Sequence, residues 1–93
     1  MLAYANGDVN RAYVVEVKSH PREEPIAQIK TLLENFRRYF PEHGNKTVYG
    51  ILAAVDLAPA IRERALREGL YVARIHDNVF EMGTPEGFRP WAF

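Results

Sequence analysis

A carboxylate and an amine lie two residues apart in this sequence, at Glu16 and Lys18. Their segment, RAYVVEVKS, has the pattern of a β-strand, so both side chains should project from one face. A carboxylate can hold a divalent cation, and a neighbouring ammonium group can orient water or offset phosphate charge. The backbone carbonyl of Val17 would add an oxygen ligand. The pattern therefore predicts a site for metal-assisted phosphodiester cleavage; the alternative is a solvated Glu–Lys pair on an open strand face.

The first half of the chain is predicted to form a hairpin and a helix. Met1–Ala5 and Arg11–Ser19 are expected strands, joined by a turn at Asn6-Gly7-Asp8 because Asn and Gly tolerate tight-turn backbone angles. Apolar residues then recur at helical spacing and predict a helix of about four turns that ends before Pro41. These residues are Ile26, Ile29, Leu33, Phe36 and Phe40.

The second half alternates strands and helices. Val48–Val55 is a continuous apolar run, which is typical of a central strand buried on both faces. A helix from Pro59 to about Gly69 follows, with Asp56 as its expected cap, and then strands at Leu70–Ile75 and Val79–Met82. We therefore expect one α/β domain over residues 1–93, with a mixed sheet flanked by helices in the order hairpin-α-β-α-β-β.

Alternation in the second strand also predicts which of its faces is covered. We expect its odd-numbered apolar residues to pack toward the helix that carries Leu33 and Phe36, leaving the Glu16–Lys18 pair on the open face. These strand residues are Tyr13, Val15 and Val17.

Composition restricts the function classes. The 93 residues include no cysteine, which excludes disulfides, thiolate metal sites and cysteine nucleophiles and makes a reducing cytoplasm the expected location. Twelve basic residues balance twelve acidic ones, so any affinity for nucleic acid must be local. The chain has no apolar run of membrane-spanning length, and its three histidines have no metal-ligand spacing: His20, His43 and His76.

The segment VVEVKS, preceded by a hairpin and followed by a helix and the apolar strand KTVYGILAAV, resembles the core of the PD-(D/E)xK nucleases. The resemblance extends through RRYFPEH and REGLYVARI and so covers most of the chain. It implies a restriction-endonuclease-like fold and Mg²⁺-dependent cleavage of DNA, with Glu16 as metal ligand and Lys18 as catalytic lysine. Some relatives place an auxiliary polar residue early in the following helix, where this chain has Glu24 and Gln28. Glu24 is interpreted as a solvated residue of the helix surface, and for Gln28 both interpretations stay open.

The sequence departs from that family at its start. The family's opening helix is missing, and its first motif is an Asp on the first hairpin strand, where this chain has Met1-Leu2-Ala3-Tyr4. Asp8, the only carboxylate before Glu16, is expected in or beside the turn. Either the chain starts late within a longer reading frame, or it is a reduced domain without catalysis.

Two functions follow from this departure. The first is Mg²⁺-dependent DNA hydrolysis if the acidic ligand is supplied, with little or no activity expected from the 93 residues alone. The second is a catalytically inactive nuclease-fold module for protein assembly or weak nucleic-acid binding. A homodimer is expected to cover the flank exposed by the missing helix.

The remaining candidates are interpreted as structural. His20 is expected to be a surface residue, because Pro21 ends the strand. The aromatic tail should pack on the protein's own core through Phe88, Trp91 and Phe93. Five arginines are interleaved with acids and are interpreted as solvated helix faces: Arg37, Arg38, Arg62, Arg64 and Arg67.

Overall fold

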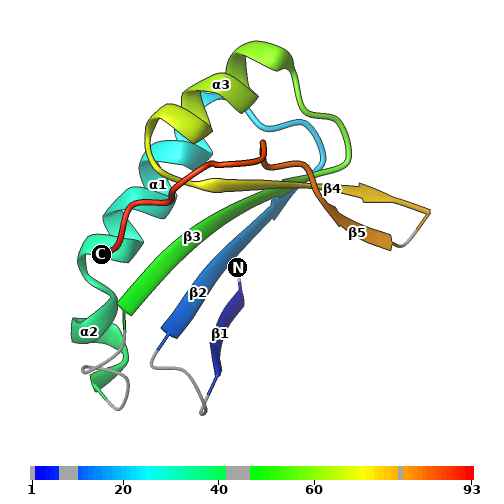
Figure 1. Ribbon diagram of the computed structural model, residues 1–93. Helices are drawn as coiled ribbons and strands as arrows, with labels where there is room; N and C mark the ends of the chain where they lie inside the picture. Colours follow the sequence, from blue (N-terminus) through cyan, green and yellow to red (C-terminus); the bar gives the residue numbers. More distant parts are fainter. Residues whose placement is uncertain (1, 7–10, 42–46, 78) are drawn as a thin grey trace.

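The computed structural model describes residues 2–6, 11–41, 47–77 and 79–93 (Figure 1). Its elements, in sequence order, are β1 (Leu2–Asn6), β2 (Arg11–Lys18), α1 (Glu23–Glu34), α2 (Phe36–Tyr39), β3 (Thr47–Ala54), α3 (Pro59–Arg67), β4 (Tyr71–His76) and β5 (Val79–Met82). The predicted element order is confirmed. Gly7 and Asp8 of the predicted turn lie outside the described residues, as do Met1 and His43.

The described strands form one mixed sheet in the order β1-β2-β3-β4-β5. The central strands β2, β3 and β4 are parallel, and β1 and β5 pair antiparallel at the two edges. This arrangement confirms the predicted mixed α/β sheet. Both crossovers step in the same direction along the sheet, so α1 and α3 lie on the same face (Figure 1). These two helices therefore flank one face of the sheet.

The predicted four-turn helix is interrupted at Asn35. Its side-chain amide donates to the Thr31 carbonyl at 2.8 Å, and its φ of −108° is not helical. Asparagine competes in this way for backbone partners, so α1 ends at Glu34 and α2 begins at Phe36.

The hydrophobic core lies between the helices and one face of the sheet. The expected orientation of β2 is wrong: Ala12 and Val14 face this core, whereas Val17 is 45% exposed on the opposite face. Both faces of β2 carry apolar residues, and the face with Ala12 and Val14 packs beneath the helix. The buried core consists of Ala12, Val14, Ile26, Ile29, Leu33, Phe36, Val48, Leu52, Ala65, Leu70 and Val72.

Gly50 sets the distance between α1 and β3. A Cβ atom at this position would lie 2.7 Å from Leu33 and 3.1 Å from Ile29, both on α1, and 2.6 Å from Leu70. A side chain at this position would therefore force the Leu33 and Leu70 side chains to rearrange.

β3 is central as predicted, and Leu52 is fully buried. Tyr49 and Ile51 on its helix-free face are only half-buried, so the expected burial on both faces is incomplete, and Val55 lies beyond the strand and is exposed.

A row of aromatic rings crosses the face of the sheet opposite the helices. Tyr13 stacks on Tyr49 with ring centroids 5.7 Å apart, and Tyr71 makes edge contacts with Tyr49 and with Phe88. Burial, reinforced by the two other tyrosines, raises the pKa of Tyr71 above its ordinary value of 10.0. These partly buried rings form an apolar layer on the helix-free face.

The C-terminal tail packs back on the domain, as predicted. Phe93 exchanges two backbone hydrogen bonds with Val48, on the part of β3 that β4 does not reach. Trp91 donates its backbone N–H to the carbonyl of Gly69, whose φ of +79° and contact with the indole ring both require glycine. The tail thus covers an otherwise open strand edge.

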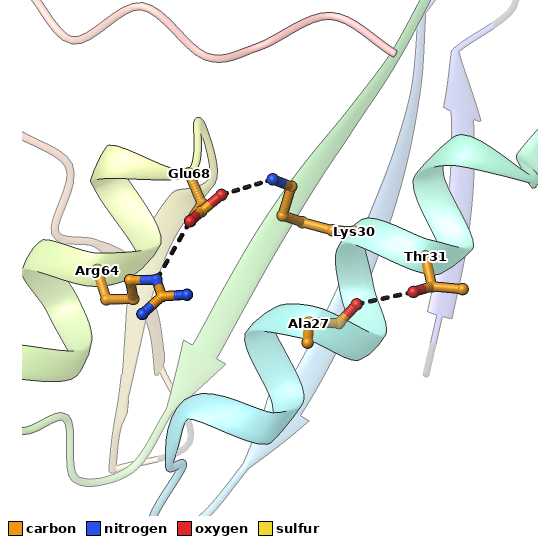
Figure 2. A network of polar contacts seen from close by, with 5 residues as sticks. All are labelled: Ala27, Lys30, Thr31, Arg64 and Glu68. Carbon is orange, nitrogen blue, oxygen red and sulfur yellow. Dashed lines mark hydrogen bonds and ion pairs between the residues drawn. The ribbon is translucent and has the colours of Figure 1, made fainter.

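An ion-pair network joins α1 to α3. Lys30 and Arg64 both donate to the carboxylate of Glu68, from opposite sides (Figure 2). Lys30 also lies over the Trp91 ring, 4.8 Å from its centroid. The hydrogen bond from Lys30 is the main cause that lowers the pKa of Glu68 below its ordinary value of 4.5.

This pKa shift predicts acid-dependent stability. A carboxylate with a lowered folded-state pKa stabilises the fold fully above about pH 4.5, and that stabilisation is lost as the pH falls through the folded value. Glu68→Gln should therefore reduce the free energy of unfolding at pH 7 by about 1 kcal/mol or less and flatten its decline toward pH 3. Urea unfolding at a series of pH values measures this, with the exposed Glu63→Gln as control. Parallel pH profiles for wild type and Glu68→Gln would contradict the assignment.

Candidate functional site

Glu16 and Lys18 lie together, as their spacing predicts. The Lys18 Nζ atom is 3.4 Å from Glu16 Oε1, and both side chains leave the same face of β2. This face is the one beneath α1, however, so the expectation of an open face is wrong. The Glu16 side chain is only 13% exposed, whereas that of Lys18 is 43% exposed. The carboxylate is therefore largely shielded, and the ammonium group lies at the entrance.

Local sequence explains how α1 comes to cover the pair. β2 ends at Lys18, and the buried Pro21 turns the chain out of the strand because proline has no N–H for the ladder. Pro25 lies in the first turn of α1, where a missing N–H costs nothing. The helix then runs back over β2, so its first half lies above the strand's carboxyl end (Figure 1).

Two neighbouring pockets meet at this end of β2. One of about 460 Å³ is lined by Glu16, Ala27, Gln28, Thr31 and Leu32. The other, of about 220 Å³, is lined by Lys18, His20, Pro21, Arg22, Glu24, Pro25 and Gln28. Gln28 lines both pockets and so connects the pocket of Glu16 with the pocket of Lys18. The two helix residues singled out from the sequence, Glu24 and Gln28, are both at the site.

The backbone of β2 offers a further oxygen. The Lys18 carbonyl accepts the Val55 N–H at 3.3 Å and so points toward β3. Successive carbonyls of a strand point to opposite sides, which directs the Val17 carbonyl toward β1. Pairing with the described part of β1 ends at Leu2, opposite Val15, so the Val17 carbonyl lies beyond it.

These donors fit a weakly held Mg²⁺ ion. Mg²⁺ prefers oxygen ligands and is usually held by one or two carboxylates, with water and substrate phosphates completing the octahedron. Glu16 and the Val17 carbonyl match this chemistry. Within the described ranges, no three His, Asp or Glu side chains gather into a metal-binding group. A second anionic ligand is therefore what the described part of the site lacks.

The hairpin register locates where such a ligand would have to be. β1 begins at Leu2, which pairs with Val15, so no described residue of β1 lies opposite Glu16. Asp8 lies outside the described residues. The paired residues Asn6 and Arg11 lie at the start of β2, whereas Glu16 and Lys18 lie near its end.

Sequence reasoning missed two polar residues near the carboxyl ends of the strands. Asp56 was expected to cap α3, but the N-cap is Ala58, and Asp56 instead lies 3.4 Å from the exposed His20. Arg74 lies near the end of β4 and is not a candidate from sequence, because a lone arginine in a strand matches no motif. The parallel order of β2, β3 and β4 was the signal that places these strand ends at one edge.

Three of the five arginines interpreted as solvated helix faces form intramolecular hydrogen bonds. Arg37 donates to the Phe93 carbonyl at 3.0 Å, Arg62 to the Gly83 carbonyl at 2.9 Å, and Arg64 to Glu68. Arg38 and Arg67 are exposed, as predicted for a solvated helix face. His76 is also on the surface, 3.4 Å from Asp77.

Comparison of the chain with protein-family models, with curated proteins and with solved structures finds no match. Its function must therefore be argued from the geometry of the site.

A partly buried carboxylate should reduce the stability of the fold. Glu16 is shielded beneath Ala27 and Leu32, so Glu16→Met should raise the free energy of unfolding by about 1 kcal/mol, because the cost of removing a charge from water disappears. Urea unfolding tests this, with Glu63→Met on the exposed face of α3 as control, expected within about 0.5 kcal/mol of wild type. A loss of more than about 1 kcal/mol would instead assign Glu16 a structural role.

Proposed function

We propose that this chain carries the core of a PD-(D/E)xK-type nuclease and acts in Mg²⁺-dependent hydrolysis of DNA. The observation that supports this most is the shielded Glu16 carboxylate, 3.4 Å from Lys18, at the carboxyl end of a central parallel strand with Gln28 above it. The element order, an antiparallel hairpin followed by two parallel crossovers, agrees with a restriction-endonuclease-like core.

The residues divide the chemistry between them. Hydrolysis adds a water oxygen to phosphorus, breaks the bond to one ester oxygen, and delivers a proton to that leaving oxygen. Glu16 and the Val17 carbonyl hold Mg²⁺, which when bound supplies positive charge and a more acidic water. Lys18 places an ammonium group where the phosphate accumulates negative charge, and it orients the attacking water. The Gln28 amide positions a phosphate oxygen or water between the two pockets.

The substrate is expected to bind through local contacts. The net charge is zero, so attraction to DNA depends on cations near the site rather than on the overall field.

Among the described residues, none of the helices is long and apolar enough to cross a membrane.

The proposal predicts that a second carboxylate restores cleavage. Leu2 pairs with Val15, next to Glu16 on β2, so a variant with Met1→Asp behind an added initiator methionine introduces a carboxylate directly before this pair. We expect the unaltered chain to be nearly inactive and this variant to cleave labelled DNA with Mg²⁺ at least about a thousandfold faster. Gel assays of the products measure the rate.

The controls are single substitutions in that variant. Glu16→Gln and Lys18→Met should each abolish cleavage, whereas Glu63→Gln on the outer face of α3 should leave it unchanged. An inactive Met1→Asp variant that is folded, or cleavage that survives Glu16→Gln, would refute the proposed site.

The second candidate function is a non-catalytic assembly module. The helix-free face of the sheet favours it, because Val17 is 45% exposed beside the partly buried rings of Tyr13, Tyr49 and Tyr71. An apolar sheet face of this kind is usually covered by another element or subunit. We propose a symmetric homodimer through this face.

The dimer has its own test. Val17→Lys should convert the dimer to a monomer without unfolding it, because the substitution introduces a charge at an exposed position on the proposed interface. Light scattering at micromolar concentration gives the mass, with Arg38→Glu as a control on the helical side. A monomeric wild-type chain would contradict the homodimer.

A further inference from the structure

A third pocket, of about 320 Å³, lies where α3 meets the hairpin of β4 and β5. It is lined by Leu57, Arg62, Val72, Ala73, Arg74 and Gly83. Two arginines therefore face a cavity whose lining includes no carboxylate. A guanidinium group matches the geometry of phosphate oxygens, so the chemistry of this lining favours a phosphate.

The sheet register places this pocket beside the candidate site. Lys18 pairs with Ala54, and Ala54 pairs with Arg74, so the three residues form one row across adjacent parallel strands. Residues in one row project from the same face, and neighbouring strands lie about 4.8 Å apart. The Lys18 and Arg74 backbones are therefore about 10 Å apart at the same edge of the sheet, separated by the small side chain of Ala54.

The two arginines retain hydrogen-bonding capacity. Arg62 uses Nη2 to donate to the Gly83 carbonyl at 2.9 Å, which holds its guanidinium in place and leaves other N–H groups for a ligand. Arg74 is exposed and forms no ion pair with another described residue. Glu81 is its cross-strand neighbour in β5, yet the two are not ion-paired.

We infer that Arg62 and Arg74 bind a second phosphate of the nucleic-acid strand cleaved at Glu16 and Lys18. This inference rests on the proposed function. The rise of roughly 3.4 Å per nucleotide is only the axial part of the separation between successive phosphates, so about 10 Å corresponds to a phosphate within two nucleotides of the scissile one. The pocket thus fixes the register of the strand on the sheet edge, and contributes a positioning contact outside the reacting atoms.

Equilibrium binding tests the inference without cleavage. The chain is titrated against a short fluorescein-labelled DNA duplex in EDTA, and anisotropy is followed at several salt concentrations. Arg74→Gln should weaken binding at least about fivefold at low salt and reduce the slope of log affinity against log salt by about one. Arg74→Lys should retain most of the affinity, and Glu81→Gln should increase it.

The matched control is Arg67→Gln, an equal charge change on α3 outside the pocket, expected to weaken binding by less than about twofold. Equal losses for Arg67→Gln and Arg74→Gln, or no measurable binding by the wild-type chain, would overturn the inference. Cleavage that depends on Lys18 alongside binding insensitive to Arg74 would sink only the inference. Binding that depends on Arg74 without cleavage by the Met1→Asp variant would sink only the nuclease proposal.

Discussion

Close packing of α1 on β3 is the constraint on which the rest of this structure depends. Ile29 and Leu33 approach the sheet at Gly50, where an added methyl group would require the Leu33 side chain to move and would lie in tight contact with Ile29. The helix can reach this depth because the neighbouring positions on β2 are the small Ala12 and Val14. The same approach brings the first half of α1 over the end of β2, so the packing of the core also builds the wall of the site.

The site is the point at which this core stops being apolar. Along the helix-facing side of β2 the residues run from Ala12 and Val14 to Glu16 and Lys18, so the face changes from buried to charged over four positions. Glu16 is shielded at the boundary, and Lys18 extends toward solvent. A shielded carboxylate at the edge of an apolar core loses part of its hydration, and the neighbouring Lys18 ammonium group offsets part of that cost.

Much of this arrangement follows from local sequence patterns. Alternation in RAYVVEVKS correctly brings Glu16 and Lys18 together, and the continuous apolar run correctly makes β3 central. The covered face of β2 could not be predicted, because Tyr13 and Val15 are as apolar as Ala12 and Val14, and only tertiary packing distinguishes the two sets. Side-chain competition at Asn35 similarly overrides the helical spacing around it.

Residues brought to the site by topology are harder to predict. Arg74 and Lys18 are 56 positions apart, and only the parallel register through Ala54 aligns them. No spacing rule along the chain carries that information. The parallel strand order does, because the carboxyl ends of adjacent parallel strands share one edge.

Diffraction from crystals soaked in Mn²⁺ tests the central claim most directly, since the anomalous signal locates the ion independently of activity. We predict a peak in contact with the Glu16 carboxylate and the Val17 carbonyl, and its loss in Glu16→Gln. A peak at His20 and Asp56 or at His76 with nothing beside Glu16, or no peak at millimolar Mn²⁺, would contradict the assignment of this site as a metal-dependent centre.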